Sequence, residues 1–156
     1  MIMPEIDIFG VKEILKQRYP FLMVDRIIDY DDEHIIGYKN VTINEPFFTG
    51  HFPEDPVMPG VMILESMGQV TSVLLGIKLG REQGKKIAFL TGIDKARFRK
   101  PVRPGDKLVT RAELTNVRKS SAKAKAEAYV DDELVAEAEF LTIIGDTLAK
   151  EQEVSN

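Results

Sequence analysis

Residues 61–80, VMILESMGQVTSVLLGIKLG, restrict the fold more than any other stretch of the chain. Pro59 stands where a helix favours proline and Gly80 supplies a stop signal, so the stretch predicts one helix of about twenty residues, roughly 30 Å long. Its apolar side chains fall on every side, and such a helix is either surrounded by protein or inserted into a membrane. Because polar residues such as Glu65 and Gln69 interrupt the apolar run and no positive flank orients it, we expect a central helix of a folded domain and no membrane insertion.

The remaining sequence predicts β-strands that can surround such a helix. Alternation in 122–130, AKAKAEAYV, places small alanines on one face and charged residues on the other, as expected for a sheet with one face on a helix and one in water. A short amphipathic helix over 9–17, capped by Asp7, comes first. The pattern predicts an α+β domain, residues 1–148, in which a strongly curved antiparallel sheet surrounds the long helix, with a frayed tail at 149–156. The strands are expected at 21–30 and 34–43, forming a hairpin, and at 87–99, 107–118, 123–130 and 133–144.

The composition excludes several functional classes. The chain has no cysteine, which excludes disulfides and thiolate chemistry, and its two histidines, His34 and His51, lack the spacing of a metal pair, so we expect no metal and no cofactor. A formal net charge of −4 over 156 residues argues against a dedicated nucleic-acid binder. The start, MIMPEIDIFG, lacks the basic and apolar regions of a signal peptide, which predicts a cytoplasmic protein.

His51 and Glu65 are the residues best suited to acid–base chemistry. His51 lies in GHFPEDPVMPG, where three prolines hold the loop, and its free pKa of about 6.5 lets an imidazole take and return a proton near neutrality. Glu65 is the only charged residue of the long helix before its last turn, and burial would raise its pKa and make it a general acid. The other interpretation of Glu65 is structural, as a cap or as half of an ion pair. His34, in the acidic turn DDEHII, is expected to be a solvated surface residue.

Gly60 stands where the long helix begins. Backbone N–H groups in the first turn of a helix have no helical partner, and an unhindered one at Gly60 can point at a carbonyl oxygen of a substrate. The alternative is that the glycine only permits close packing. A base, an acid and such a donor together match an α,β-elimination beside a thioester carbonyl, where enolate-like charge develops.

A basic run, DKARFRKPVRPGD at 94–106, lies in a strand where Ala96 and Phe98 are expected to face inward. An outward basic face suits an acidic partner or a phosphate. A solvated face that offsets acidic neighbours explains the run equally well. The basic residues are Lys95, Arg97, Arg99, Lys100 and Arg103.

Four segments in order, RYPFLMVDRI, YKNVTINEPFFTGHFP, PVMPGVMILESMGQ and KARFRKPVRPGD, resemble the β-hydroxyacyl-acyl carrier protein dehydratases of bacterial type II fatty acid synthesis, over residues 14–144. The resemblance implies a hot-dog fold, a long helix wrapped by an antiparallel sheet. It also implies a homodimer in which each site is shared across the dimer interface. Three such dimers usually form a hexamer. His51 and Glu65 would be the catalytic pair, one from each subunit, and a glutamate at position 65 resembles this dehydratase and not its relative that also isomerises the double bond.

The resemblance also implies a mechanism. His51 would remove the C2 proton of a (3R)-hydroxyacyl thioester while Glu65, directly or through water, protonates the departing C3 hydroxyl, giving a trans-2-enoyl product. Gly60 N–H would hold the thioester carbonyl, and the acyl chain would lie in an apolar tunnel beside the long helix. The basic run would receive acyl carrier protein and its phosphopantetheine arm. The substrate-binding residues expected besides Gly60 are Phe52, Val61, Gln69 and Phe89.

The chain departs from the family pattern in two places. Lys16 and Gln17 stand where members commonly have Pro and His, outside the catalytic pair. Phe89 stands where members often carry a tyrosine thought to gate the tunnel, so gating and acyl-length preference can differ.

Two other functions fit the same residues. Hot-dog domains also host thioesterases, and a fold alone does not fix function. Hydrolysis would release free acid and carrier thiol in place of an enoyl product. A non-catalytic acyl-binding module would keep its binding when His51 or Glu65 is replaced.

Overall fold

The long central helix is present in the computed structural model, which describes residues 5–80 and 86–146. Helix α2 spans Gly60–Lys78, with Pro59 as its N-cap, and Gly80 follows it with a φ of +81°, a left-handed conformation that glycine adopts without steric cost. Its sequence is long and apolar enough to cross a membrane, but 56% of the most apolar stretch is buried within the domain. The apolar residues on all sides of α2 are therefore those of a core helix.

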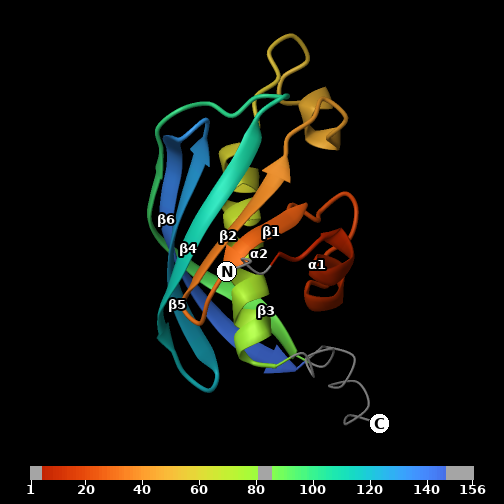
Figure 1. Ribbon diagram of the computed structural model, residues 1–156. Helices are drawn as coiled ribbons and strands as arrows, with labels where there is room; N and C mark the ends of the chain where they lie inside the picture. The colour runs from red at the N-terminus through yellow and green to blue at the C-terminus, as the bar shows by residue number, and fades with distance from the viewer. Residues whose placement is uncertain (1–4, 81–85, 147–156) are drawn as a thin grey trace, which may run out of the picture.

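Six antiparallel strands form one sheet that curves around α2 (Figure 1). The order across the sheet is β1-β2-β4-β5-β6-β3, so β1 and β3 are the two edges. This is the predicted α+β hot-dog architecture. The strands are β1 (Arg26–Tyr30), β2 (His34–Asn40), β3 (Lys86–Phe98), β4 (Lys107–Val117), β5 (Ser121–Val130) and β6 (Glu133–Asp146).

The sheet packs closely on α2 because small residues cover its inner face. Every second residue of β5 from Ala122 to Ala128 is a buried alanine, and Ala136 and Ala138 of β6 are also buried. Alanine places little between the backbone of the sheet and the large side chains of the helix, such as Met67. The alternation predicted for 122–130 is confirmed.

The first strand begins later than predicted, at Arg26 and not at residue 21. The backbone groups of Met23 bind α2: Gln69 Oε1 accepts from the Met23 N–H at 2.7 Å, and Ser66 Oγ donates to the Met23 carbonyl at 2.9 Å. The N–H and carbonyl of Met23 are therefore not available to pair with another strand. Residues 15–25 thus form a strap that lies across α2.

Helix α1 spans Ile8–Ile14 and is shorter at its C-terminal end than the predicted 9–17. Asp7 caps it as expected, because its Oδ1 accepts from the Gly10 N–H at 3.1 Å. The guanidinium of Arg18 donates to the carbonyls of Lys12, Leu15 and Gln17. These bonds satisfy carbonyl groups that a continued helix would have used, so the chain leaves the helix after Ile14.

Strand β3 is irregular around Lys95. The pairing of β3 with β6 shifts between Asp94 and Arg97, and Lys95 has a φ of +53°. Ala96 packs on the core as predicted, but Phe98 does not face fully inward, since 51% of its surface is exposed. A β-bulge inserts an extra residue and breaks the alternation on which the prediction for Phe98 rested.

Candidate active site

The loop that carries His51 is closed by hydrogen bonds between its own ends. His51 Nδ1 lies 2.7 Å from the Val57 carbonyl oxygen, and the Val57 N–H donates to the His51 carbonyl at 3.0 Å. A carbonyl oxygen can only accept, so in the neutral ring Nδ1 carries the proton and Nε2 keeps its lone pair. The loop therefore presents Nε2 as a base.

Further contacts fix the position of this loop. The ring of His51 stacks on that of Phe52, with centroids 4.1 Å apart. Arg103 Nη1 binds Asp55 Oδ1 at 2.5 Å, and the Met58 N–H donates to the Val102 carbonyl at 2.8 Å. These bonds hold residues 55–58 against the β3–β4 connection, which leaves the imidazole little freedom to turn.

An open groove of about 410 Å³ brings His51 next to the first residue of α2. Gly60 lines it together with Phe98, Arg99 and Lys100. The Gly60 N–H lies in the first turn of a helix, where the partial positive charge of the helix dipole is largest. A side chain at position 60 would place its Cβ 3.0–3.3 Å from the Phe98 ring, so close packing and access to this N–H both favour glycine.

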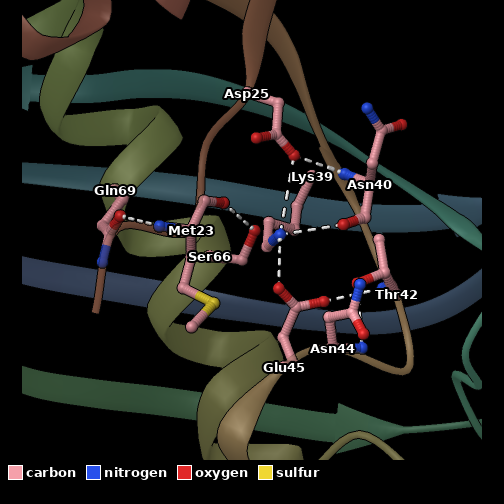
Figure 2. A network of polar contacts seen from close by, with 9 residues as sticks. All are labelled: Met23, Asp25, Lys39, Asn40, Thr42, Asn44, Glu45, Ser66 and Gln69. Carbon is pink, nitrogen blue, oxygen red and sulfur yellow. Dashed lines mark hydrogen bonds and ion pairs between the residues drawn. The ribbon is translucent and has the colours of Figure 1, made fainter. Parts of the chain in front are cut away.

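Glu65 is half-buried in the second turn of α2, where Gln69 holds its carboxylate. Gln69 Nε2 donates to Glu65 Oε1 at 2.7 Å and also to the Phe21 carbonyl at 2.7 Å. Gln69 is only 1% exposed, and its Oε1 accepts from the Met23 N–H (Figure 2). Glu65 is thus connected through one amide to the strap across α2.

A second cavity, of about 260 Å³, contains Glu65 and not His51. Phe89 lines it from β3, with 39% of its surface exposed, and Gln69 lines it from α2. Within one chain the predicted catalytic pair therefore lies in two separate cavities. Val61, another predicted substrate-binding residue, has 72% of its surface exposed in the first turn of α2.

Several residues that line the Glu65 cavity were not predicted, among them Gln17, Gly68 and Ser72. Gly68 and Ser72 follow Glu65 by three and seven positions, so helical periodicity contained the signal for both. Gln17 has no such signal, because its position depends on how the strap folds back over α2.

The basic run is largely paired with carboxylates of the same chain. Lys95 binds Glu139 at 3.5 Å, Arg99 binds Glu137 at 2.9 Å, Lys100 binds Glu133, and Arg103 binds Asp55. The hydrogen bond that Arg99 donates to the Glu137 carboxylate raises the pKa of Arg99 above its usual range. In the single chain the run thus offsets acidic neighbours, as the second interpretation expected, while Arg97 donates to the carbonyl of Ala96.

His34 is a surface residue, as predicted. Its Nδ1 lies 3.2 Å from Asp31 Oδ1 in the β1–β2 turn. The backbone N–H groups of Glu33 and His34 donate to the same carboxylate and lower the pKa of Asp31. Over residues 5–80 and 86–146, no three His, Asp or Glu side chains gather in a group suited to hold a metal ion.

Comparison with known proteins gives a consistent set of relatives. Residues 15–139 match the model of the FabA-like domain. The 3-hydroxyacyl-[acyl-carrier-protein] dehydratase FabZ of Chlamydia muridarum is 50% identical over 143 residues, covering 90% of this chain and 94% of its own length. The protein of the same name from Syntrophobacter fumaroxidans is 51% identical over 140 residues, covering 90% and 95%.

Solved structures with low sequence identity share the fold. A chain of the dehydratase heterocomplex ApeI:P from Xenorhabdus doucetiae superposes with a TM-score of 0.77 at 17% identity, over 94% of this chain and 97% of that one. A hypothetical thioesterase from Streptococcus pneumoniae, solved with coenzyme A, gives a TM-score of 0.60 at 13% identity, over 78% and 85%. At such identities the likeness concerns the fold alone.

Proposed function

The chain belongs to the FabZ group of 3-hydroxyacyl-[acyl-carrier-protein] dehydratases within the FabA-like family, and from this premise we propose that His51 and Glu65 perform its acid–base chemistry. The enzyme dehydrates 3-hydroxyacyl-acyl carrier protein in fatty acid biosynthesis. The observation that carries the proposal is the 2.7 Å contact of His51 Nδ1 with the Val57 carbonyl. This contact leaves Nε2 free to accept a proton.

The elimination uses one base and one acid. His51 Nε2 takes the C2 proton of the thioester, and the C2–H electron pair becomes the C2=C3 double bond. Glu65 gives a proton, directly or through water, to the C3 hydroxyl, which leaves as water. The imidazolium and the carboxylate return to their starting states by proton exchange with solvent.

Negative charge develops on the thioester oxygen as the C2 proton leaves. Gly60 lines the same groove as His51, so its N–H and the positive end of α2 lie where that oxygen can bind. This arrangement stabilises the enolate-like transition state more than the neutral substrate, which is the condition for accelerating the reaction.

The pair meets across two subunits of a homodimer. Two observations support this: His51 and Glu65 line different cavities of one chain, and β3 is an edge strand with large exposed apolar side chains. Phe89, Leu90 and Ile93 of β3 are 39%, 47% and 37% exposed. An exposed apolar edge is a template for pairing with another chain. A hexamer of three such dimers remains a prediction from the family resemblance.

Acyl carrier protein docks beside the His51 groove. Arg99 and Lys100 line that groove, so a phosphopantetheine arm that passes them reaches His51 and Gly60. Their carboxylate partners on β6 can be displaced by an acidic partner because both ion pairs are about half exposed to water. Three points remain predictions. They are the docking roles of Lys95, Arg97 and Arg103, substrate binding by Phe52 and Val61, and the cytoplasmic location.

Product analysis with three proteins tests the proposed chemistry. We expect wild type to form the conjugated enoyl thioester, followed by its absorbance, and expect His51→Ala and Glu65→Ala to lose about 10²–10⁴-fold in rate, the usual contribution of a positioned acid or base. His34→Ala is the matched control, since His34 lies on the surface, and should keep full activity. Circular dichroism checks that each variant is folded. Release of free acid, or wild-type rates in folded His51→Ala, would contradict the proposal.

A further inference from the structure

One face of α2 carries a continuous line of cavity-lining residues that starts at Glu65. Gly68, Ser72, Leu75 and Leu79 follow at spacings of three, four, three and four, which keeps them on one side of the helix. The Glu65 cavity covers the first half of this line. A smaller cavity of about 70 Å³ covers the second half, from Ser72 to Leu79.

Three residues line both cavities: Gln17, Ser72 and Ala88. They come from three separate parts of the fold, which are the strap, α2 and β3. Residues shared by two neighbouring cavities mark the wall between them. Gln17 has the longest side chain of the three and is half-buried at this boundary.

The walls beyond Gln17 suit the end of an alkyl chain. Among the residues that line the smaller cavity are Ile14, Leu15, Leu75 and Ile144, all aliphatic, and Leu15 and Leu75 are almost fully buried. Burial of apolar surface is the favourable term for an acyl chain in such a space. The amide of Gln17 opposes passage, because an alkyl chain against it removes water from a polar group without replacing the hydrogen bonds.

The distance along α2 between Glu65 and Ser72 gives the length of acyl chain that fits before the wall. Glu65 and Ser72 are seven residues apart, roughly 10 Å along the helix axis. An extended chain advances roughly 3.3–3.6 Å for every three bonds, so about nine carbon–carbon bonds fit between them. With C3 of the substrate at Glu65, an acyl chain reaches the wall at about its twelfth carbon.

We infer that Gln17, together with Ala88 and Ser72, sets the acyl-length limit of this enzyme: chains up to about twelve carbons end before Gln17, and longer chains must displace it to enter the smaller cavity. The inference rests on the proposed function, because it takes Glu65 as the position of C3. It assigns to Gln17 a role in specificity, separate from the catalytic pair.

Two variants change the wall in opposite directions. Gln17→Ala removes the amide and should raise kcat/KM for a 3-hydroxyacyl carrier of about sixteen carbons relative to one of about eight, by roughly tenfold, the scale at which pocket contacts discriminate alkyl groups. Ala88→Leu fills the wall and should lower the same ratio by a similar factor. Glu13→Ala, an exposed change in the neighbouring helix α1, should leave the ratio at its wild-type value.

The binding of the same carriers, followed by fluorescence anisotropy, gives a second readout that needs no turnover. Opposite shifts of the length profile in the two variants support the inference. A profile that keeps its wild-type shape in both, with melting temperatures that show folded protein, overturns it. Failure to form enoyl product at any length would contradict the proposed function instead, and the binding series would still decide the role of Gln17.

Discussion

His51 and Glu65, the two proposed catalytic side chains, are each held by one short hydrogen bond to a neighbour that is itself anchored. His51 Nδ1 meets the Val57 carbonyl and Glu65 Oε1 meets Gln69 Nε2, both at 2.7 Å. Gln69 was predicted to bind substrate. Its amide nitrogen donates to two protein oxygens and its oxygen accepts from Met23, so we expect it to position Glu65.

Replacing Gln69 should separate this positioning role from stability. Gln69→Leu leaves the Met23 N–H and the Phe21 carbonyl without their partner, and we expect a loss of about 1–3 kcal/mol in the free energy of unfolding. It also releases the Glu65 carboxylate, so kcat should fall by roughly tenfold or more, the effect of misplacing a catalytic group. Urea denaturation and initial rates measure the two effects.

Ser66→Ala is the matched control for that experiment. Ser66 is fully buried and donates to the carbonyl of the same Met23 residue, but its hydrogen bond does not involve Glu65. We expect a comparable loss of stability with kcat near the wild-type value. An equal fall in kcat in both variants would assign Gln69 a structural role only.

His51 and Glu65 could be predicted as candidate acid–base residues from the sequence, but the groups that orient them could not. A histidine in a proline-rich loop and a lone carboxylate in an apolar helix are visible as residue types. Val57 acts through its carbonyl, which every residue has, and the partners of Gln69 lie 46 and 48 positions away. Such contacts depend on the path of the strap, which no local pattern encodes.

At the scale of elements, a buried lysine connects three segments near the loop that carries His51. Lys39 of β2 has a side chain only 9% exposed, and its Nζ lies 3.0 Å from Glu45 Oε1 and 3.6 Å from Asp25 Oδ2 (Figure 2). Asp25 belongs to the strap, and Glu45 directly precedes the short 3₁₀ helix Pro46–Thr49. That helix leads into the His51 loop.

Removing this cation should destabilise the fold strongly. Lys39→Met leaves two partly buried carboxylates without their counter-charge, so we expect a loss of about 3 kcal/mol in the free energy of unfolding, the lower end for a broken buried pair. Lys107→Met is the matched control, because Lys107 is exposed and its Nζ only covers the ring of Tyr38, 4.0 Å from the centroid. That change should cost about 1 kcal/mol or less. Equal urea midpoints for the two variants would show that Lys39 does not connect these segments.

Elements with strong periodicity were predicted well, and those shaped by tertiary contacts were not. The long helix and the alanine-rich strand matched the prediction because the spacing of their apolar residues shows whether the element is buried on all sides or on one face. The start of β1, the end of α1 and the bulge in β3 differ from the prediction. In the first two cases a side chain takes up backbone groups that the regular element would have used: Gln69 from 46 positions away for β1, and the nearby Arg18 for α1.

At the scale of the whole molecule, one chain places the two proposed catalytic residues in separate cavities. The His51 groove lies at the N-terminal end of α2, and the Glu65 cavity runs along α2 beneath β3. The edge strand β3, with its exposed apolar side chains, borders the Glu65 cavity. In the proposed symmetric dimer each subunit would give the same surface to its partner, so both sites would form together.

Mixing two inactive variants tests this account most directly. His51→Ala and Glu65→Ala are each prepared separately, mixed in equal amounts under conditions that exchange subunits, and assayed for enoyl product, with exchange verified by mass spectrometry of differently tagged chains. Random pairing makes half of the dimers mixed, and each mixed dimer has one intact site of two, so we predict recovery of about a quarter of the wild-type activity. No recovery despite verified exchange would contradict a site built by His51 of one subunit and Glu65 of the other.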